Sequence, residues 1–124
     1  MMINNRPVFL NLFQFRFPIA AIMSVGHRAS GVLMVLAFPF LVYILDLSLQ
    51  GEAGFAAARE ILQSLPVRLV LFLLLWALMH HLLAGIRFLL IDFDIGVGRE
   101  QARLSAWFVM LAAPLLALLV GVLS

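Results

Sequence analysis

Cysteine is absent from the 124 residues of this chain. Its absence excludes disulfide bonds, thiolate ligands to iron–sulfur clusters and haem attached covalently through cysteine. Any redox group would therefore be held without a covalent link, through side chains such as histidine or methionine.

Charged residues are scarce, and lysine is missing altogether. Asp, Glu, Lys and Arg together make up 11% of the chain, and the eight basic residues are all arginines that stand apart from one another. A protein that follows nucleic-acid phosphates needs clustered basic side chains, so we predict no nucleic-acid partner. The sequence also offers no nucleophile paired with a base, and we expect no independent catalytic activity.

Apolar residues make up 65% of the chain, whereas soluble domains contain about 45–50%. Three stretches reach the roughly 20 residues that a bilayer-crossing helix needs, at about 22–49, 67–91 and 104–123. None alternates with a period of two, and backbone in lipid must satisfy its own hydrogen bonds, which favours helices over barrel strands. We predict an all-α membrane protein with three transmembrane helices, forming one anchor domain over residues 1–124.

A short amphipathic helix is predicted between the first and second spans. Apolar residues recur there at helical spacing, at Phe55, Ala58, Ile61, Leu62 and Leu65, and the polar face is interpreted as Glu52, Arg59 and Glu60. Such a helix fits the plane of the membrane interface, although an ordinary surface helix would show the same pattern. The second connection, Asp92 to Arg103, contains two glycines and is predicted to be a turn.

Arginine placement predicts the orientation in the membrane. One side carries Arg6, Arg16, Arg28, Arg87, Arg99 and Arg103, and the other carries Arg59 and Arg68. Positive residues accumulate on the cytoplasmic side, so we expect the N-terminus in the cytoplasm and Ser124 outside. Residues 17–26 also resemble the apolar core of a signal peptide, but cleavage after them would leave the longer apolar stretch behind as a helix.

A polar stripe stands where the first span enters the membrane. Ser24, His27, Arg28 and Gly31 fall at i, i+3, i+4 and i+7, on one face of a helix. A hydroxyl, an imidazole and a guanidinium at the membrane edge suit a ligand with polar oxygens and an apolar tail. An interfacial arginine that reaches for lipid headgroups would give the same pattern, and both interpretations stay open.

His81 stands about 9 Å deeper in the membrane than Arg87, by the rise of a helix. A histidine at that depth needs a partner. Gly85, one turn on, leaves a gap on the same face, and Ala77 and Ala84 are expected to keep that neighbourhood small. A flat macrocycle could lie there with the imidazole on its metal, and a hydrogen bond to a neighbouring helix is the alternative.

His80 and His81 cannot bind one metal ion from an unbroken helix, because adjacent side chains project about 100° apart. Gly85 lies on the side of His81, which favours His81 as the ligand and leaves His80 facing elsewhere. A six-coordinate haem would then need a second ligand from outside this helix. His27 lies at the membrane edge, so a second subunit is the more economical source.

Several segments together resemble a known family. They are Arg6-Pro7, residues 16–19 (RFPI), residues 24–31 (SVGHRASG) and residues 81–93, which contain His81, Gly85, Ile86, Arg87, Asp92 and Phe93. In this order they are similar to the cytochrome b anchor subunit of succinate dehydrogenase over nearly the whole chain. The resemblance implies a multi-pass protein of the bacterial cytoplasmic (inner) membrane.

The resemblance also implies partners and a reaction. A soluble flavoprotein subunit would oxidise succinate to fumarate, and an iron–sulfur subunit would pass the electrons to ubiquinone. The quinone would bind where that subunit meets two membrane anchors, of which this chain would be one. The chain would hold one haem b, shared with the second anchor subunit.

Residue by residue, Ser24 and Arg28 match quinone-site residues of the family. His27 and Arg28 match positions near the haem propionates, Gly85 lies in the haem-binding motif, and His81 matches an axial ligand of the haem iron. Phe88 departs from the pattern, because several relatives carry a histidine there. The alternatives are the anchor of a fumarate reductase, which runs the reaction in reverse, and a haem-free structural membrane subunit.

Overall fold

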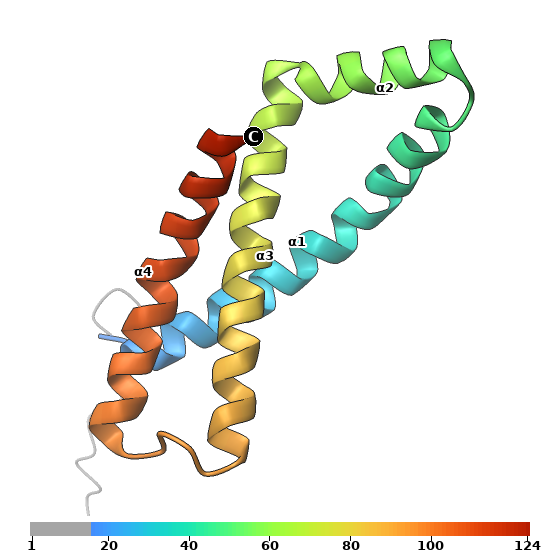
Figure 1. The fold of residues 1–124 in the computed structure, drawn as a ribbon. Coiled ribbons are helices and arrows are strands. Elements are labelled where there is room, and N and C mark those ends of the chain that lie inside the picture. The colour runs from blue at the N-terminus through green and yellow to red at the C-terminus, as the bar shows by residue number, and fades with distance from the viewer. Residues whose placement is uncertain (1–15) are drawn as a thin grey trace, which may run out of the picture.

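The computed structural model describes residues 16–124, which form four helices (Figure 1). These are α1 (Ile19–Ser48), α2 (Glu52–Gln63), α3 (Leu65–Asp92) and α4 (Arg99–Leu123). α1, α3 and α4 are long and apolar enough to cross a membrane, and the short α2 joins the first two of them. The predicted all-α fold with three membrane helices and a short helix after the first is confirmed.

Two of the membrane helices begin earlier than the predicted spans. α1 starts at Ile19 rather than near residue 22, and α4 starts at Arg99 rather than near residue 104. The first turn of α4 contains charged residues, which a count of apolar residues leaves out. The connection between α3 and α4 is consequently shorter than predicted and covers only residues 93–98.

α3 ends in a turn whose hydrogen bonds satisfy its last carbonyl groups. The backbone N–H of Asp94 donates to Ile91 O, and that of Ile95 donates to Leu90 O, both at 2.9 Å. Asp94 adopts the left-handed conformation, with φ of 59°, that this helix ending requires. The chain can therefore reverse within six residues and place α4 antiparallel to α3.

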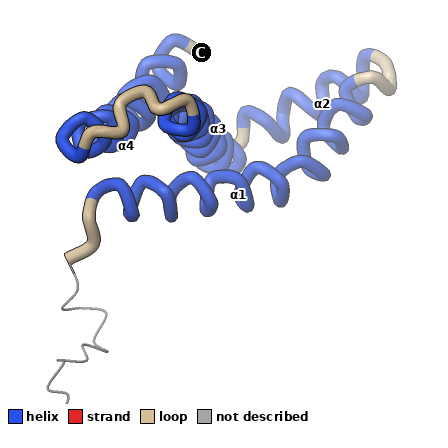
Figure 2. The backbone as a smooth tube through the Cα atoms, turned by 90° about the horizontal axis from the view of Figure 1, so that it is seen from below, coloured by secondary structure: helices blue, strands red, loops and turns tan. Residues whose placement is uncertain are grey.

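α3 and α4 lie side by side, and α1 packs across them (Figures 1 and 2). The start of α1 and the α3–α4 connection lie at one end of the molecule, and α2 lies at the other (Figure 1). Beyond the crossing, α1 and α3 diverge, and α2 bridges the space between their far ends. The predicted polar stripe of α1 and the two adjacent histidines of α3 therefore lie together at the crossing.

Small side chains allow α3 and α4 to approach closely. Ala84 of α3 is fully buried in a cluster with Met23, Ala106 and Val109. Small residues at helix contacts are typical of membrane proteins, where backbone proximity and dispersion replace the hydrophobic effect. Ala84 therefore contributes to helix packing. From the sequence we expected it to leave space beside His81 instead.

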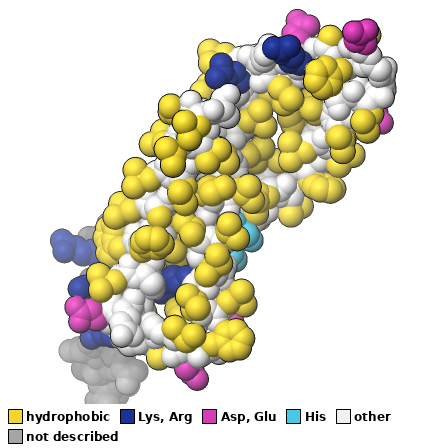
Figure 3. Space-filling model, viewed as in Figure 1, with side chains coloured by type: hydrophobic (Ala, Val, Ile, Leu, Met, Phe, Trp, Pro, Cys, Tyr) yellow, Lys and Arg dark blue, Asp and Glu magenta, His cyan; other side chains and the backbone are white. Residues whose placement is uncertain are grey.

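Most apolar side chains of the spans face outward (Figure 3). Of the most apolar 18 residues of each helix, only 11% in α1, 17% in α3 and 22% in α4 are buried within the chain. Such large exposed apolar surfaces are unstable in water. They must be covered by lipid or by other membrane subunits.

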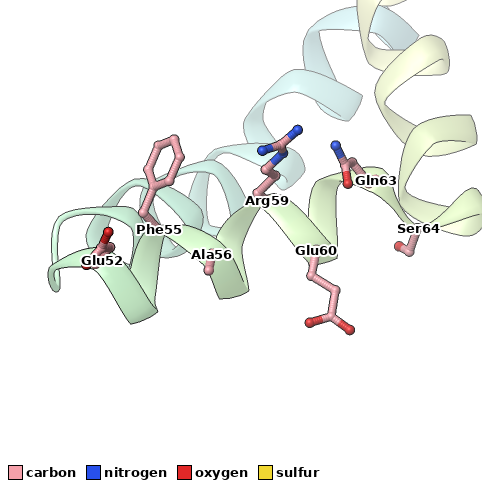
Figure 4. Close-up of a pocket in the computed structure, with 7 residues that line it drawn as sticks. All are labelled: Glu52, Phe55, Ala56, Arg59, Glu60, Gln63 and Ser64. Atoms are coloured by element: carbon pink, nitrogen blue, oxygen red, sulfur yellow. The ribbon is translucent and has the colours of Figure 1, made fainter.

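α2 lies beside the far end of α1, and its polar face differs in one residue from the prediction. Arg59 lines a groove of about 610 Å³ between α1 and α2 together with Phe55, Ala58 and Leu62. In Figure 4, Phe55 and Arg59 point to the same side of α2, whereas Glu60 points away. The assignment of Arg59 to the side opposite Phe55 was wrong, because residues i and i+4 share one side of a helix.

Arg87 ties α3 to α4 near the α3–α4 connection. Its Nε donates to Ser105 Oγ and its Nη2 donates to Ala102 O, each at 2.9 Å. Ser105 Oγ in turn donates to Ala102 O at 3.1 Å. The side chain of Arg87 is only 7% exposed, so its charge is held between helices instead of at the lipid headgroups.

The α1–α3 crossing depends on a glycine against a histidine. His80 of α3 is buried, and its Nε2 lies 3.2 Å from Met23 O of α1. A Cβ atom at Gly26 would lie 2.6 Å from that same nitrogen. The hydrogen bond can therefore form only because residue 26 has no side chain.

We expect Gly26→Ala to destabilise the protein by about 1–3 kcal/mol, because overpacking must separate the helices or break the bond to Met23. Chemical denaturation of the purified protein in detergent would measure the loss. Gly98→Ala is the matched control, since its Cβ would meet only the flexible end of Gln101 at 3.4 Å. Equal stability of the two variants would contradict the proposed tightness of the crossing.

Candidate functional site

Three histidines meet where α1 crosses α3. The rings of His27 and His81 stack with centroids 4.0 Å apart and an interplanar angle of 12°. Phe88 lies edge-on to His27 at a centroid distance of 5.3 Å. His27 is thus enclosed by side chains of α3, and the helix periodicity of both elements aims these residues at one another.

His81 has a defined proton position. Its Nδ1 lies 3.0 Å from His27 O and 3.2 Å from Ser30 Oγ. A carbonyl oxygen only accepts hydrogen bonds, so Nδ1 carries the hydrogen and Nε2 carries the lone pair. Within residues 16–124, no hydrogen-bond partner meets Nε2 of His81, and no polar side-chain atom is both buried and unpartnered. Nε2 is therefore open to a ligand.

His80 has the opposite arrangement. Its Nε2 faces Met23 O and must donate to it, which occupies the nitrogen at the tip of the ring. Trp76 lies beside the same ring, with centroids 5.4 Å apart. His80 is consequently held inside the α1–α3 contact, whereas His81 is only partly buried. Histidine atoms reach the surface midway along the molecule (Figure 3).

Two glycines accommodate the stacked rings. A Cβ atom at Gly31 would lie 3.1 Å from Cε1 of His81. A Cβ atom at Gly85 would lie 3.7 Å from Nε2 of His27. Gly85 and His81 thus share one face of α3, as the sequence predicted, but the gap above Gly85 faces the ring of His27.

The rest of the predicted polar stripe lies at the edge of the crossing. Ser24 is half-buried and Arg28 is exposed, one turn apart on α1. Among the described residues, neither side chain has a hydrogen bond or an ion pair. Both residues lie within one turn of His27 on α1. Gly31, the fourth member of the stripe, turns toward α3 instead.

Two residues acquire roles that we did not assign from the sequence. Ser30 is fully buried and contacts His81, although only its place between His27 and Gly31 marks it in the sequence. Arg87 was grouped with His81 and Gly85, but its hydrogen bonds are made to Ser105 and Ala102 of α4. No sequence pattern predicts the contact between Arg87 and Ser105, because the two residues lie on different helices.

A bare metal ion has too few ligands at this crossing. In the part of the chain that the structure describes, no three His, Asp or Glu side chains are placed so that they could hold one metal ion, and the three histidines at the crossing are no exception. A single imidazole can hold a metal ion only where other groups supply the remaining ligands. The open Nε2 of His81 is therefore suited to a metal that arrives already bound in a cofactor.

Comparison with known proteins identifies a family over nearly the full length of the chain. Residues 2–120 match the family described as succinate dehydrogenase/fumarate reductase transmembrane subunit. The chain is 34% identical over 118 residues to the succinate dehydrogenase cytochrome b556 subunit of Coxiella burnetii, covering 94% of each chain.

Other relatives bear the same name. The chain is 33% identical to the cytochrome b556 subunit of Paracoccus denitrificans, covering 93% of this chain and 88% of that one. It is 29% identical to that of Rickettsia typhi, covering 96% and 93%. The chain belongs to the family of transmembrane subunits of succinate dehydrogenase and fumarate reductase, and it is similar to the cytochrome b556 subunits of succinate dehydrogenase.

Proposed function

We propose that this chain is the membrane anchor and haem b subunit of a succinate dehydrogenase, with His81 as an axial ligand of the haem iron. The observation that carries this proposal is the proton position of His81. Its Nδ1 is engaged by His27 O, and its Nε2 lone pair is free within the described residues. Histidines that bind metals commonly donate their other ring N–H in this way.

The surroundings of His81 fit such a cofactor. His81 would hold the iron through Nε2, whose lone pair lies in the plane of the ring, whereas the ring of His27 covers one face of His81. The Cε1 edge of His81 rests against Gly31, which fixes the ring relative to α1. A bound haem b would supply one-electron transfer. The residues of this chain would hold it, orient its ligand and set its surroundings.

A second anchor subunit would supply the other axial ligand. A six-coordinate haem would need a second ligand besides His81. The ring of His27 is stacked on that of His81, so His27 is not proposed as that ligand. His80 donates its Nε2 hydrogen to Met23 O. The haem is therefore proposed to be shared, and the exposed apolar faces of the helices leave ample surface for the second anchor.

Ser24 and Arg28 are proposed to bind the head group of ubiquinone, next to the haem edge at His27. The guanidinium of Arg28 would stabilise negative charge that develops on a quinone oxygen during reduction, and the hydroxyl of Ser24 would donate a hydrogen bond to it. Both side chains lie on one face of α1 and lack partners among the described residues. Arg28 and His27 would also lie near the haem propionates.

The protein is a multi-pass membrane protein whose relatives are bacterial. We propose that it lies in the cytoplasmic (inner) membrane with its N-terminal end on the cytoplasmic side. The flavoprotein and iron–sulfur subunits would dock on that side, near Ser24 and Arg28. The arginine distribution supports this orientation, although Arg6 and the Arg6-Pro7 segment lie outside the described residues.

The orientation can be tested with reporter fusions. A periplasmic reporter such as alkaline phosphatase, fused after Ser124, should be active, because α4 would carry the C-terminus outward. The same reporter inserted after Gly96, in the α3–α4 connection, should be inactive. The reverse pattern would refute the proposed orientation and, with it, the proposed side of the quinone site.

The quinone site can be tested by substitution in the intact complex. Ser24→Ala should lower the rate of ubiquinone reduction by roughly 5–150-fold, since a hydrogen bond to a charged or polarised group is worth about 1–3 kcal/mol. Arg28→Leu should cost more, because it also removes the charge. Succinate oxidation with a soluble dye as acceptor should remain unchanged.

Matched controls for these variants lie at the opposite end of the molecule. Ser48→Ala and Arg68→Leu repeat the same chemical changes on a half-buried serine and an exposed arginine near α2, and should leave quinone reduction intact. Normal quinone reduction in both the Ser24 and Arg28 variants would show that the stripe only anchors the helix at the interface.

The haem assignment can be tested by spectra of purified variants. His81→Leu should lose the haem or convert it to a five-coordinate, high-spin form. Gly85→Leu should also weaken haem retention, because the added side chain must displace the ring of His27. His80→Leu should keep the low-spin spectrum, and His80→Gln can still donate to Met23 O if the leucine variant is unstable.

One result would overturn the assignment. If His80→Gln lost the low-spin signal while His81→Leu retained it, the ligand would be His80 and the alignment of α3 with the family would be shifted by one residue.

A further inference from the structure

Ser30 forms a closed set of hydrogen bonds with the two stacked histidines. Its side chain is 0% exposed. Its Oγ donates to His27 O at 2.8 Å and lies 3.2 Å from Nδ1 of His81. Nδ1 of His81 also meets His27 O at 3.0 Å. The Ser30 hydroxyl, the His27 carbonyl and the His81 imidazole, from two helices, are therefore joined by three hydrogen bonds around the buried side chain of Ser30.

The direction of each hydrogen bond follows from the chemistry of these groups. The carbonyl of His27 can only accept, so it receives the hydroxyl hydrogen of Ser30 and the Nδ1 hydrogen of His81. With its own hydrogen committed to the carbonyl, Ser30 Oγ can only accept from Nδ1. The Nδ1–H group of His81 is thus shared between two acceptors, and a hydroxyl that already donates is a better acceptor.

We propose that Ser30 is a positioning residue that lowers the midpoint potential of the haem held by His81. This inference rests on the proposed role of His81 as an axial ligand. Acceptors at Nδ1 draw the hydrogen away from the ring and make the imidazole a stronger donor through Nε2. A stronger donor favours iron(III) over iron(II), so the one-electron reduction of the iron moves to a more negative potential.

The position of Ser30 also fixes the plane of the His81 ring. The Cε1 edge of the ring faces Gly31, and its Nδ1 faces the hydroxyl of Ser30. Rotation of the ring about the Cβ–Cγ bond would therefore either break the hydrogen bond to Ser30 or bring the ring against the backbone at Gly31. Removal of the hydroxyl leaves His27 O as the single acceptor and lessens this restraint.

The experiment is a redox titration of the purified complex, followed by the absorption band of the reduced haem. Ser30→Ala should move the midpoint potential to a more positive value. It should also change the electron paramagnetic resonance signal of the oxidised low-spin haem, which reports the orientation of the axial imidazole. Ser30→Thr keeps a hydroxyl and should restore both properties.

Ser48→Ala is the matched control. Ser48 lies on the same helix and makes the same type of bond, from its Oγ to the carbonyl oxygen of Leu45 three residues earlier, at 2.7 Å. It lies at the far end of α1, remote from His81, so its replacement should leave the potential unchanged. A Ser30→Ala potential that is unchanged or more negative, or a Ser30→Thr potential that shifts as far as that of Ser30→Ala, would overturn the inference.

Failure of the inference can be told apart from failure of the proposed function. A complex without a b-type haem, or a His81→Leu variant with an unaltered spectrum, would refute the role of His81 itself. Loss of the haem in His81→Leu, with no change in the potential of Ser30→Ala, would refute only the role of Ser30.

Discussion

The approach of α1 to α3 is limited by glycine, and the arrangement of the histidines depends on that approach. Gly26 makes room for His80, and Gly31 makes room for His81. Adjacent residues on one helix thus meet two glycines five residues apart on the other. A side chain at Gly26 would either separate the helices or displace the ring of His80 from Met23 O, and one at Gly31 would press on the ring of His81. The hydrogen bonds that define the proton positions of both histidines therefore depend on these glycines.

Polar groups inside a membrane are costly unless they are paired, and this distinguishes residues of the scaffold from the proposed site residues. His80 and Arg87 are buried and bonded to the backbone of neighbouring helices, which makes them part of the scaffold. Among the described residues, Nε2 of His81 and the side chains of Ser24 and Arg28 have no such partners. In a hydrocarbon environment, polar groups that the fold leaves unpaired are those that a ligand or another subunit must satisfy.

The fold could be predicted from the sequence, because it depends on local patterns, whereas the stacking of His27 on His81 could not. Three long apolar stretches predict the helices, and spacing on one helix places His81 and Gly85 on one face. Contacts between helices carry no such signal. The role of Ser30 depends on the depth at which α3 meets α1, and the role of Arg87 depends on its partner on α4. The prediction that Arg59 lies opposite Phe55 on α2 was wrong for a different reason. It followed from the charge of Arg59, whereas the spacing of four residues from Phe55 places both on one side of the helix.

The proposed haem and quinone sites are joined through one residue of α1. The backbone carbonyl of His27 fixes the proton of His81, while its ring stacks on that ligand. The next residue in the chain is Arg28, which turns outward to the proposed quinone site. A rotation of α1 that moved Arg28 would therefore also move the carbonyl that holds His81. The two sites share a rigid helix instead of a flexible loop, so the distance between them is set by the glycine-limited crossing itself.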